Sequence, residues 1–279
     1  MAATEQTVRR GTTPGPRASE LEIERRASVL VLTLARPERR NSLSEAMLAA
    51  LQTAIDGAGD DAGVRAVVIA ATGSAFCAGH DLKELTARRQ DADGGKAYYE
   101  LLMRQCAKLM RSIVRCPKPV IAAVQGTAQA AGCQLVATCD LAVAAEEATF
   151  CTPGVDIGLF CSTPMVALSR NVSRKRAMEM LLLGELLPAR LAQEYGLVNR
   201  VVPAARLMQE ALALADAIAS KPAATLAIGK EAFYRQIEMN LGDAYDFAAG
   251  VMVQNMMHAE SQEGIGAFLE KRKPVWDKS

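Results

Sequence analysis

Short apolar runs alternate with helical patterns along most of the chain, up to about residue 202. Four such runs, over 28–35, 64–71, 119–126 and 140–145, are rich in Val, Ile, Leu and Ala, as buried strands are. Helical patterns lie between them. This order predicts an α/β core with largely parallel strands.

The first two predicted helices each have one apolar face. Ser42 and Glu45 have the spacing of a capping box, which predicts that the first helix begins there. The apolar faces follow the three- and four-residue spacing of a helix. The face of the first helix comprises Met47, Leu48, Leu51 and Ile55. The face of the second, apolar except for Gln105, comprises Tyr98, Leu101, Leu102, Gln105, Leu109 and Ile113.

After residue 202, four helical patterns follow one another with no strand pattern between them. Phe247, Met252, Met256 and Met257 crowd together in this region, which is too apolar for an isolated bundle. These residues pack either on the core of the same chain or on a neighbouring subunit. We therefore divide the chain into a core and a helical C-terminal region, with the boundaries 19–202 and 203–279.

Residues 1–18 mix Pro, Gly, Thr and Arg without a hydrophobic period, which predicts a flexible N-terminal tail. Their Arg content also suits an organellar transit peptide. No secretory segment is recognised, and the apolar runs are shorter than the roughly 20 residues that span a bilayer. We expect a cytoplasmic protein, or a mitochondrial matrix protein if the tail is a transit peptide.

The composition excludes several classes of partner. A net charge of +1, with both signs spread along the chain, favours neither nucleic acid nor a membrane surface. The seven cysteines form no C-x-x-C pair and lie mostly in apolar segments, so we expect reduced core thiols. With two histidines and no clustered ligands, no metal site is expected. Phosphate-binding loops and a G-x-S-x-G motif are also missing from the sequence, which argues against dehydrogenases, kinases and serine hydrolases.

Two turns of small residues connect a predicted strand to a predicted helix. They are GSAFCAGHDLKEL, over 73–85, and QGTAQAAGCQLVATCD, over 125–140. The first N–H groups of a helix have no partner within it, so such turns can bind an oxyanion if they converge. Small residues at such turns also serve close packing, and either turn alone is explained by it.

Together, six segments resemble the crotonase family, also called the enoyl-CoA hydratase/isomerase family. In chain order they are RPERRNSLSEAM, GSAFCAGHDLKEL, KPVIAAVQGTAQAAGCQLVATCDLAVA, FCTPGVDIGLF, LLLGELLPARLAQEYGLVNRVV and EGIGAFLEKRKPVW. GHDLKEL and TPGVDIGLFCSTP are most similar to one mitochondrial subgroup of that family. The resemblance covers roughly residues 20–279.

The resemblance implies a spiral of ββα units with a C-terminal helical trimerisation region, assembled as a homotrimer or a dimer of trimers. It also implies an acyl-CoA thioester whose carbonyl oxygen lies between the N–H groups of His80 and Ala131. Coenzyme A would arrive as part of the substrate, with no permanently bound cofactor.

The same resemblance indicates where catalytic acids are missing. Hydratases of this family carry a Glu at the place of Gln134 and a second Glu directly after a Pro, where this chain has Pro153 and Gly154. An amide has no accessible basic pKa and glycine has no side chain, so hydration by the usual pair of carboxylates should be slow. We expect the double change Gln134→Glu with Gly154→Glu to raise it.

Three polar residues near these turns have alternative interpretations. His80 either contributes its imidazole, as its similarity to the decarboxylases of the family suggests, or turns its side chain to solvent, which we favour. Asp81 is expected to cap the helix that follows it. Asp156 is the acid nearest to Gly154 and either substitutes for the missing Glu or has a loop or capping role.

Nucleotide-binding residues are also implied by the resemblance, some of them across a subunit boundary. They are Arg39, Asn41, Ser42, Leu43, Ala78, Asp81, Leu82, Phe268 and Lys271. The leading hypothesis is an acyl-CoA-binding protein of enoyl-CoA hydratase/isomerase type that stabilises a thioester enolate. The alternatives are a CoA-thioester decarboxylase or isomerase, and a non-catalytic acyl-CoA binder or modulatory subunit.

Overall fold

The computed structural model describes residues 20–276, and the predicted tail over 1–18 lies outside them. Six strands form the larger of two sheets, in the order β1-β2-β3-β5-β7-β10. Neighbouring strands from β2 onward are parallel, and β1 pairs with β2 in the antiparallel direction. The strands are β1 (Leu21–Arg26), β2 (Val29–Leu34), β3 (Ala66–Ala71), β5 (Val120–Val124), β7 (Leu141–Ala145) and β10 (Arg200–Val202).

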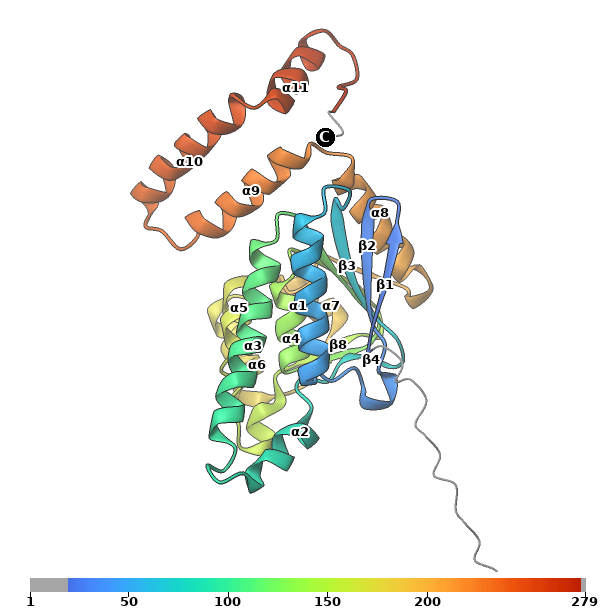
Figure 1. Ribbon diagram of the computed structural model, residues 1–279, viewed down its shortest axis with the longest axis vertical. Coiled ribbons are helices and arrows are strands. Elements are labelled where there is room, and N and C mark those ends of the chain that lie inside the picture. Colours follow the sequence, from blue (N-terminus) through green and yellow to red (C-terminus); the bar gives the residue numbers. More distant parts are fainter. Residues whose placement is uncertain (1–19, 277–279) are drawn as a thin grey trace, which may run out of the picture.

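Helices cover both faces of this sheet. Alternate residues of a strand point to opposite sides, so each strand contributes to both helical layers. In β3, Val67 and Ile69 belong to the main core with α1 (Glu45–Asp60) and α3 (Lys96–Arg115). Val68 faces the other way, into a smaller cluster with α8 (Leu207–Ala219). Figure 1 shows the sheet lying between these two helical layers. The inner strands β3 and β5 are therefore apolar on both faces, whereas the edge strand β1 is mostly exposed.

The smaller sheet is built from the strands that follow β3, β5 and β7 in the chain. Its order is β4-β6-β8-β9, and β4, β6 and β8 are parallel. A helix comes after β4 and after β6, namely α2 (Leu82–Ala87) and α4 (Ala131–Thr138). The repeated order of one strand in each sheet and then a helix confirms the predicted α/β spiral of ββα units. The strands are β4 (Ala75–Cys77), β6 (Thr127–Gln129), β8 (Thr149–Cys151) and β9 (Leu187–Pro188).

Further helices complete the described chain. The α-helices are α5 (Pro164–Asn171), α6 (Arg174–Leu183), α7 (Ala189–Glu194), α9 (Ala223–Gln236), α10 (Leu241–Met256) and α11 (Ala259–Leu269). The 3-10 helices are η1 (Pro37–Arg39), η2 (Arg88–Gln90), η3 (Pro153–Ile157) and η4 (Ala204–Arg206). No single helix within 20–276 is long and apolar enough to span a membrane. One pair, Ala204–Ala219 with Ala223–Gln236, meets the length and composition test together but bends by 105°.

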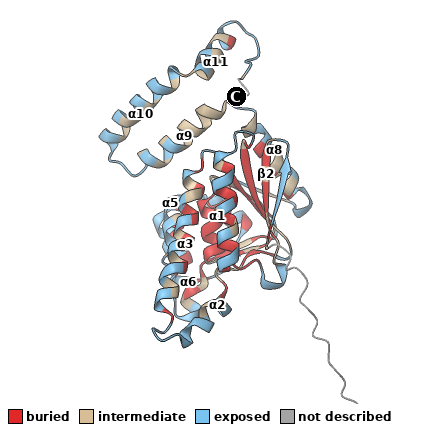
Figure 2. Ribbon diagram, viewed as in Figure 1, coloured by how far each residue is buried: buried red, intermediate tan, exposed pale blue. Residues whose placement is uncertain are grey.

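The last three helices stand apart from the core, whereas α8 packs on the large sheet (Figure 1). Neither α9 nor α10 contains a buried residue, as Figure 2 shows. The α9 helix is tied to the core by Lys230, whose Nζ lies 2.6 Å from Asp140 Oδ2, and by Tyr234, whose hydroxyl lies 2.9 Å from Asp140 Oδ1. Most apolar residues of these helices are therefore not covered by their own core.

Two details of the predicted helices were wrong. The first helix begins at Glu45 and is capped by Ser44, whose hydroxyl accepts a hydrogen bond from Met47 N. Ser42 does not cap it, because the chain is still turning at the preceding residue, Asn41, whose φ is +51°. In α3, Leu101 was expected to be buried but is half exposed, whereas Cys106 and Met110 were not expected and are buried. The buried face of this helix is therefore rotated about the helix axis relative to the predicted face.

Candidate active site

The first turn runs from β4 into α2 and is held by the main chain of Leu43. The N–H of Leu43 donates to Gly79 O at 2.8 Å, and its carbonyl accepts from Asp81 N at 3.4 Å. These two bonds flank His80, which forms a parallel bridge with Leu43. Gly79 has a φ of +90°, a conformation that favours glycine. The main chain of His80 is thereby fixed from both sides.

The second turn runs from β6 into α4 and passes through a strained residue. Ala130 has a φ of +46° and a ψ of −114°, which is unusual for a residue with a side chain. Its N–H donates to Cys151 O at 2.9 Å. Directly after it, α4 begins, and a Cβ added at Gly132 would overlap with the carbonyl of Cys77 in β4. Only a glycine lets α4 approach β4 this closely.

The two turns face each other, as the sequence predicts. A Cβ added at Gly79 would lie 3.1 Å from Ala130 Cβ and 3.4 Å from Ala131 N. Among the described residues, neither the N–H of His80 nor that of Ala131 donates a hydrogen bond. Because Ala131 is the first residue of α4, its N–H also lies at the positive end of that helix. The arrangement offers two free donors to an anionic oxygen.

The side chain of His80 does not point to solvent, which corrects our expectation. Both ring nitrogens are buried and have no hydrogen-bond partner among the described residues. Burial lowers the pKa of this imidazole below its usual value, because the charged form loses its hydration. The ring is therefore neutral near pH 7.

Gln134 and Gly154 are both buried. The Gln134 amide oxygen lies 3.9 Å from Cys106 Sγ on α3. A Cβ added at Gly154 would lie 2.5 Å from Leu159 O and 2.9 Å from Cys161 Sγ. The chain therefore leaves no room for a side chain at 154 without a shift of the backbone, which argues against our expectation that Gly154→Glu would complete an acid/base pair.

Asp156 lies on the same 3-10 helix, with its side chain exposed. Its Oδ2 would lie 3.2 Å from a Cβ at Gly184, so the carboxylate lies beside the C-terminal end of α6. An exposed carboxylate at this position fits a role in the loop better than a role as the substitute for the missing Glu. Both roles of Asp156 stay predictions.

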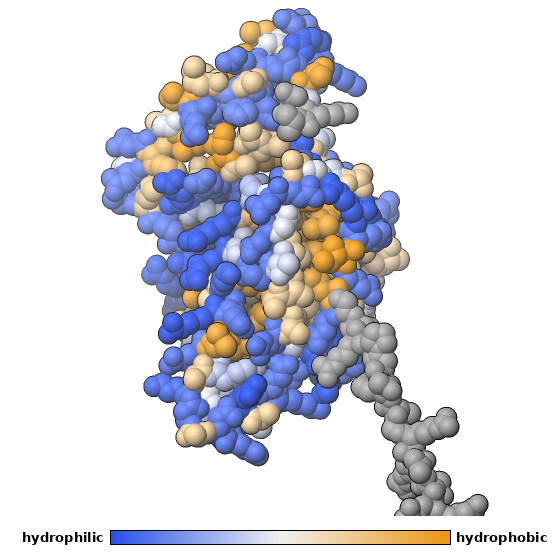
Figure 3. All heavy atoms as spheres, in the orientation of Figure 1, coloured by the Kyte–Doolittle hydropathy of each residue, from blue (hydrophilic) through white to orange (hydrophobic). Residues whose placement is uncertain are grey.

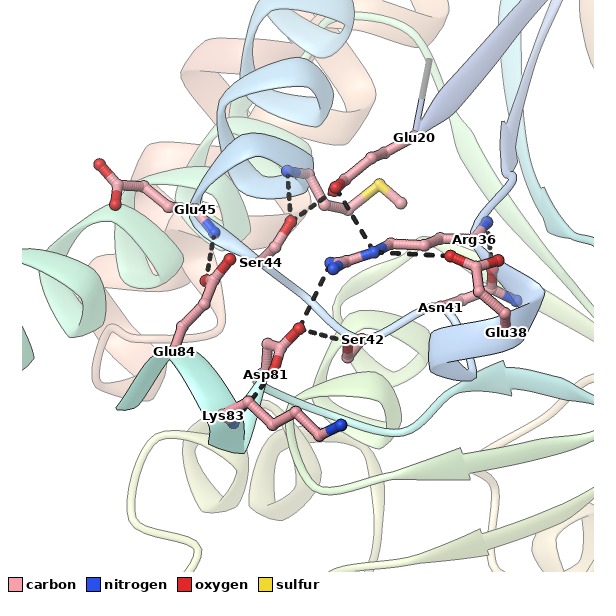
Figure 4. A network of polar contacts seen from close by, with 11 residues as sticks. Glu20, Arg36, Glu38, Asn41, Ser42, Ser44, Glu45, Asp81, Lys83 and Glu84 are labelled. Atoms are coloured by element: carbon pink, nitrogen blue, oxygen red, sulfur yellow. Dashed lines mark hydrogen bonds and ion pairs between the residues drawn. The ribbon is translucent and has the colours of Figure 1, made fainter. Parts of the chain in front are cut away.

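Asp81 caps α2, as predicted, by accepting a hydrogen bond from Lys83 N at 3.0 Å. Figure 4 shows its carboxylate turned toward the 36–44 loop, where Oδ2 lies 3.4 Å from Arg36 and 3.4 Å from the hydroxyl of Ser42. Arg36 also pairs with Glu20 at 3.4 Å. The network is buried or half-buried and joins the first turn to the beginning of the described residues at Glu20. Sequence reasoning missed Arg36 and Glu20, because the pattern gives no sign that they meet Asp81.

Asn41 has a structural role in the same loop. Its amide oxygen accepts from Arg36 N, and its Nδ2 donates to Thr72 O and Ala75 O, each at 2.8 Å. Leu43 is fully buried in the core. The side chains of Asn41 and Leu43 are therefore occupied by the fold, and any contact of theirs with a nucleotide has to come from the main chain.

The other predicted nucleotide-binding residues lie in two places. Arg39 and Leu82 are exposed near the first turn, and Ala78 is half-buried there. Phe268 and Lys271 are exposed at the end of α11, which Figure 1 places at the opposite end of the molecule from α2. The chain alone does not bring these two groups together.

A polar pocket of about 160 Å³ lies beside β4 and β6. Of the residues predicted for the site, only Ala78 lines it. The sequence did not indicate Arg40 or Gln129, because neither belongs to a recognisable pattern. The lining residues are Arg40, Ser74, Ala75, Ala78, Thr127 and Gln129.

Comparison with known proteins gives one consistent family. The model of the enoyl-CoA hydratase/isomerase family matches residues 24–279. The human enoyl-CoA hydratase domain-containing protein 3, named as mitochondrial, is 47% identical over 245 residues, which is 88% of this chain and 79% of that protein. The resemblance of this chain to one mitochondrial subgroup, which the sequence indicated, is thereby confirmed.

Two crystal structures have the same fold. An enoyl-CoA hydratase from Mycobacterium smegmatis superposes with a TM-score of 0.87 at 53% identity, covering 92% of this chain and 98% of that one. The human enoyl-CoA hydratase domain-containing protein 3 superposes with a TM-score of 0.88 at 45% identity, covering 92% of this chain and all of that one. The chain therefore belongs to the crotonase, or enoyl-CoA hydratase/isomerase, family.

Proposed function

We propose that this protein binds a CoA thioester with its carbonyl oxygen between the N–H groups of His80 and Ala131, and stabilises the enolate formed from it. The observation that carries the proposal is the pair of free donors on two facing turns. Donors that are fixed before the reaction stabilise negative charge as it appears in the transition state. The hole is made of main-chain atoms, so it needs no particular side chain.

Hydration by a pair of carboxylates is slow in this proposal. Gln134 carries an amide where hydratases of the family carry an acid, and Gly154 has neither a side chain nor space for one. The absence of one acid/base group typically lowers a rate by about 10²- to 10⁴-fold. Decarboxylation and isomerisation of a CoA thioester use the same oxyanion hole and are the alternative reactions.

We further propose that the protein assembles as a trimer or a dimer of trimers. The support is the exposed apolar surface of α9–α11, part of which is visible in Figure 3, together with a second apolar surface over 157–186. Apolar patches of this kind mark interfaces. Light scattering that gives a monomer at micromolar concentration would remove this part of the proposal. The exposed residues include Phe233, Leu241, Tyr245, Met252, Met257, Phe268 and Leu269 in the helices, and Ile157, Leu159, Leu182, Leu183 and Leu186 in the core.

Coenzyme A takes part only as the carrier of the acyl group in this proposal, with no resident cofactor or metal. The human relative is named as mitochondrial, which fits the transit-peptide alternative for residues 1–18. The cytoplasmic location has no such support from the relatives.

Calorimetry with acetyl-CoA, crotonyl-CoA, free CoA and S-ethyl-CoA tests the proposed site. The two thioesters should bind more tightly than S-ethyl-CoA, which has no carbonyl oxygen to place between the two N–H groups. A panel of CoA thioesters incubated with the pure protein and followed by mass spectrometry then identifies the reaction. Binding without turnover would favour the non-catalytic alternative. Failure of every CoA compound to bind up to millimolar concentration would refute the proposal.

A further inference from the structure

The imidazole of His80 is buried without a partner. Neither Nδ1 nor Nε2 forms a hydrogen bond with any described residue. The main chain of Leu43 is the polar group beside the ring and acts to raise the pKa of the imidazole, against the larger effect of burial, but its geometry falls short of a hydrogen bond with either nitrogen. Burying a polar group without a partner is costly, and native proteins rarely do so away from functional sites. The fold leaves this ring without the partner that it would need for a purely structural role.

The other titratable side chains of the two turns already have partners or are poor bases. Residues 78–82 and 127–134 contain only His80, Asp81 and Cys133 as titratable groups. Asp81 accepts from Lys83 N and pairs with Arg36. Burial raises the pKa of the Cys133 thiol, so it stays protonated. Within these two stretches, His80 is left as the one basic group, and it has no structural task.

The position of the ring relative to the oxyanion hole is set by its own main chain. The hydrogen bonds of Leu43 to Gly79 and Asp81 fix His80 on both sides, and its N–H is one of the two free donors. A thioester carbonyl held by that N–H has its α- and β-carbons one and two bonds from the carbonyl carbon. In the proposed complex, those carbons therefore lie close to the residue that carries the ring.

We propose that the His80 imidazole is the acid/base group of this site. The inference rests on the proposed binding of a CoA thioester. In hydration, the oxygen of a water molecule bonds to C3 of an enoyl thioester, and the electron pair of the C2–C3 double bond moves to form the enolate. The water proton passes to the ring nitrogen and from there to C2, so that one water is added and the ring is regenerated.

The same group exchanges the α-protons of a saturated thioester. The ring takes a proton from C2, the two N–H groups hold the enolate, and a deuteron returns to C2 from the ring after it exchanges with D2O. A neutral imidazole has one free acceptor nitrogen for this step. Its lowered pKa keeps that nitrogen available near pH 7.

Substitution of His80 tests the inference without removing the oxyanion hole, because the donor is the peptide N–H. His80→Gln should bind butyryl-CoA within a few-fold of the wild type by calorimetry. It should lose about 100-fold or more in α-proton exchange into butyryl-CoA in D2O, and similarly in hydration of crotonyl-CoA. The control is His258→Asn at the other histidine, which caps α11, because Asn retains the capping function. It should leave both rates unchanged.

Chemical rescue separates an acid/base role from a structural one. His80→Ala opens space for a free base, so added imidazole should restore exchange in His80→Ala and not in His80→Gln. Wild-type rates in His80→Gln, or a wild type that binds butyryl-CoA but exchanges no α-proton, would overturn the role of His80 and leave the binding site intact. Failure to bind any CoA thioester would instead overturn the proposed function, and this inference with it.

Discussion

A Cβ added at Gly79 would lie 3.4 Å from the amide nitrogen of Ala131, so the two turns of the site are in direct contact. Each turn is held by other main-chain groups, Gly79 by Leu43 and Ala130 by Cys151. The spacing of the two free N–H groups is therefore fixed by backbone packing. The side chains at positions 79, 130 and 131 therefore affect the site mainly by allowing or preventing the close contact between the two turns.

Gly79→Ala should lower the free energy of unfolding by about 1–3 kcal/mol, because an alanine is strained at a φ of +90°. Its Cβ would also press on Ala130, so acyl-CoA binding should weaken. Gly57→Ala in α1 is the matched control, since no atom lies within 4 Å of the added Cβ and helix propensity favours alanine. Urea denaturation and calorimetry measure both effects. Equal stability of the two variants would contradict the packing described here.

Ala130→Gly should stabilise the protein or leave it unchanged, although glycine usually costs stability. The φ of +46° at Ala130 strains a residue with a Cβ, and glycine removes that strain. Ala49→Gly, at an exposed position of α1, is the control and should cost about 1 kcal/mol. Denaturant unfolding of both variants provides the comparison. A larger loss at 130 than at 49 would show that Ala130 is not strained.

Lys230→Met should lower the free energy of unfolding by about 3–5 kcal/mol, because it leaves the Asp140 carboxylate without its cation in a mostly buried place. Since Lys230 and Tyr234 tie α9 to the core, limited proteolysis should also cut near 220–222 more readily. Arg104→Met, which breaks an exposed pair with Glu100 at 3.8 Å, should have no measurable effect. Similar effects of the two changes would argue against this attachment of α9.

Stability should fall as the pH rises from about 9 to about 12. Burial raises the pKa of the Cys77 and Cys106 thiols from 9.0 to about 12, and that of Cys151 to about 11. The unfolded chain therefore loses these protons first, which favours unfolding above pH 9 and has no effect below it. Urea unfolding in the presence of reductant between pH 7 and 11 measures this slope. A constant stability over that range would contradict the burial of the thiols.

The sequence predicted the buried strands of the large sheet, and it missed the exposed edge strand β1 and the strands of the smaller sheet. The four predicted strands became β2, β3, β5 and β7, because strands buried on both faces of a parallel sheet are continuously apolar. The strands of the smaller sheet have two or three residues, which is too short for any hydrophobic period to appear. They are nevertheless the elements that lead into both oxyanion turns.

The candidate site was predicted in its backbone and less well in its side chains. Strand-to-helix turns of small residues indicated His80 and Ala131, since free N–H groups follow from local structure. The burial of the His80 ring depends on a segment distant in the sequence, which brings Leu43 beside it. The lack of space at Gly154 depends on how the loop after it folds back, which brings Leu159 O and Cys161 Sγ against it. No local pattern carries that information.

Isotope-edited infrared spectroscopy of bound butyryl-CoA, labelled with ¹³C at the thioester carbonyl, tests the central claim most directly. Two hydrogen bonds from fixed N–H groups polarise the carbonyl, so its stretching band should move to lower wavenumber than that of the same thioester free in water. The shift should persist in His80→Gln, because the N–H group of residue 80 remains. A carbonyl band at its aqueous position, in protein shown by calorimetry to be saturated with the thioester, would contradict an oxyanion hole between His80 and Ala131.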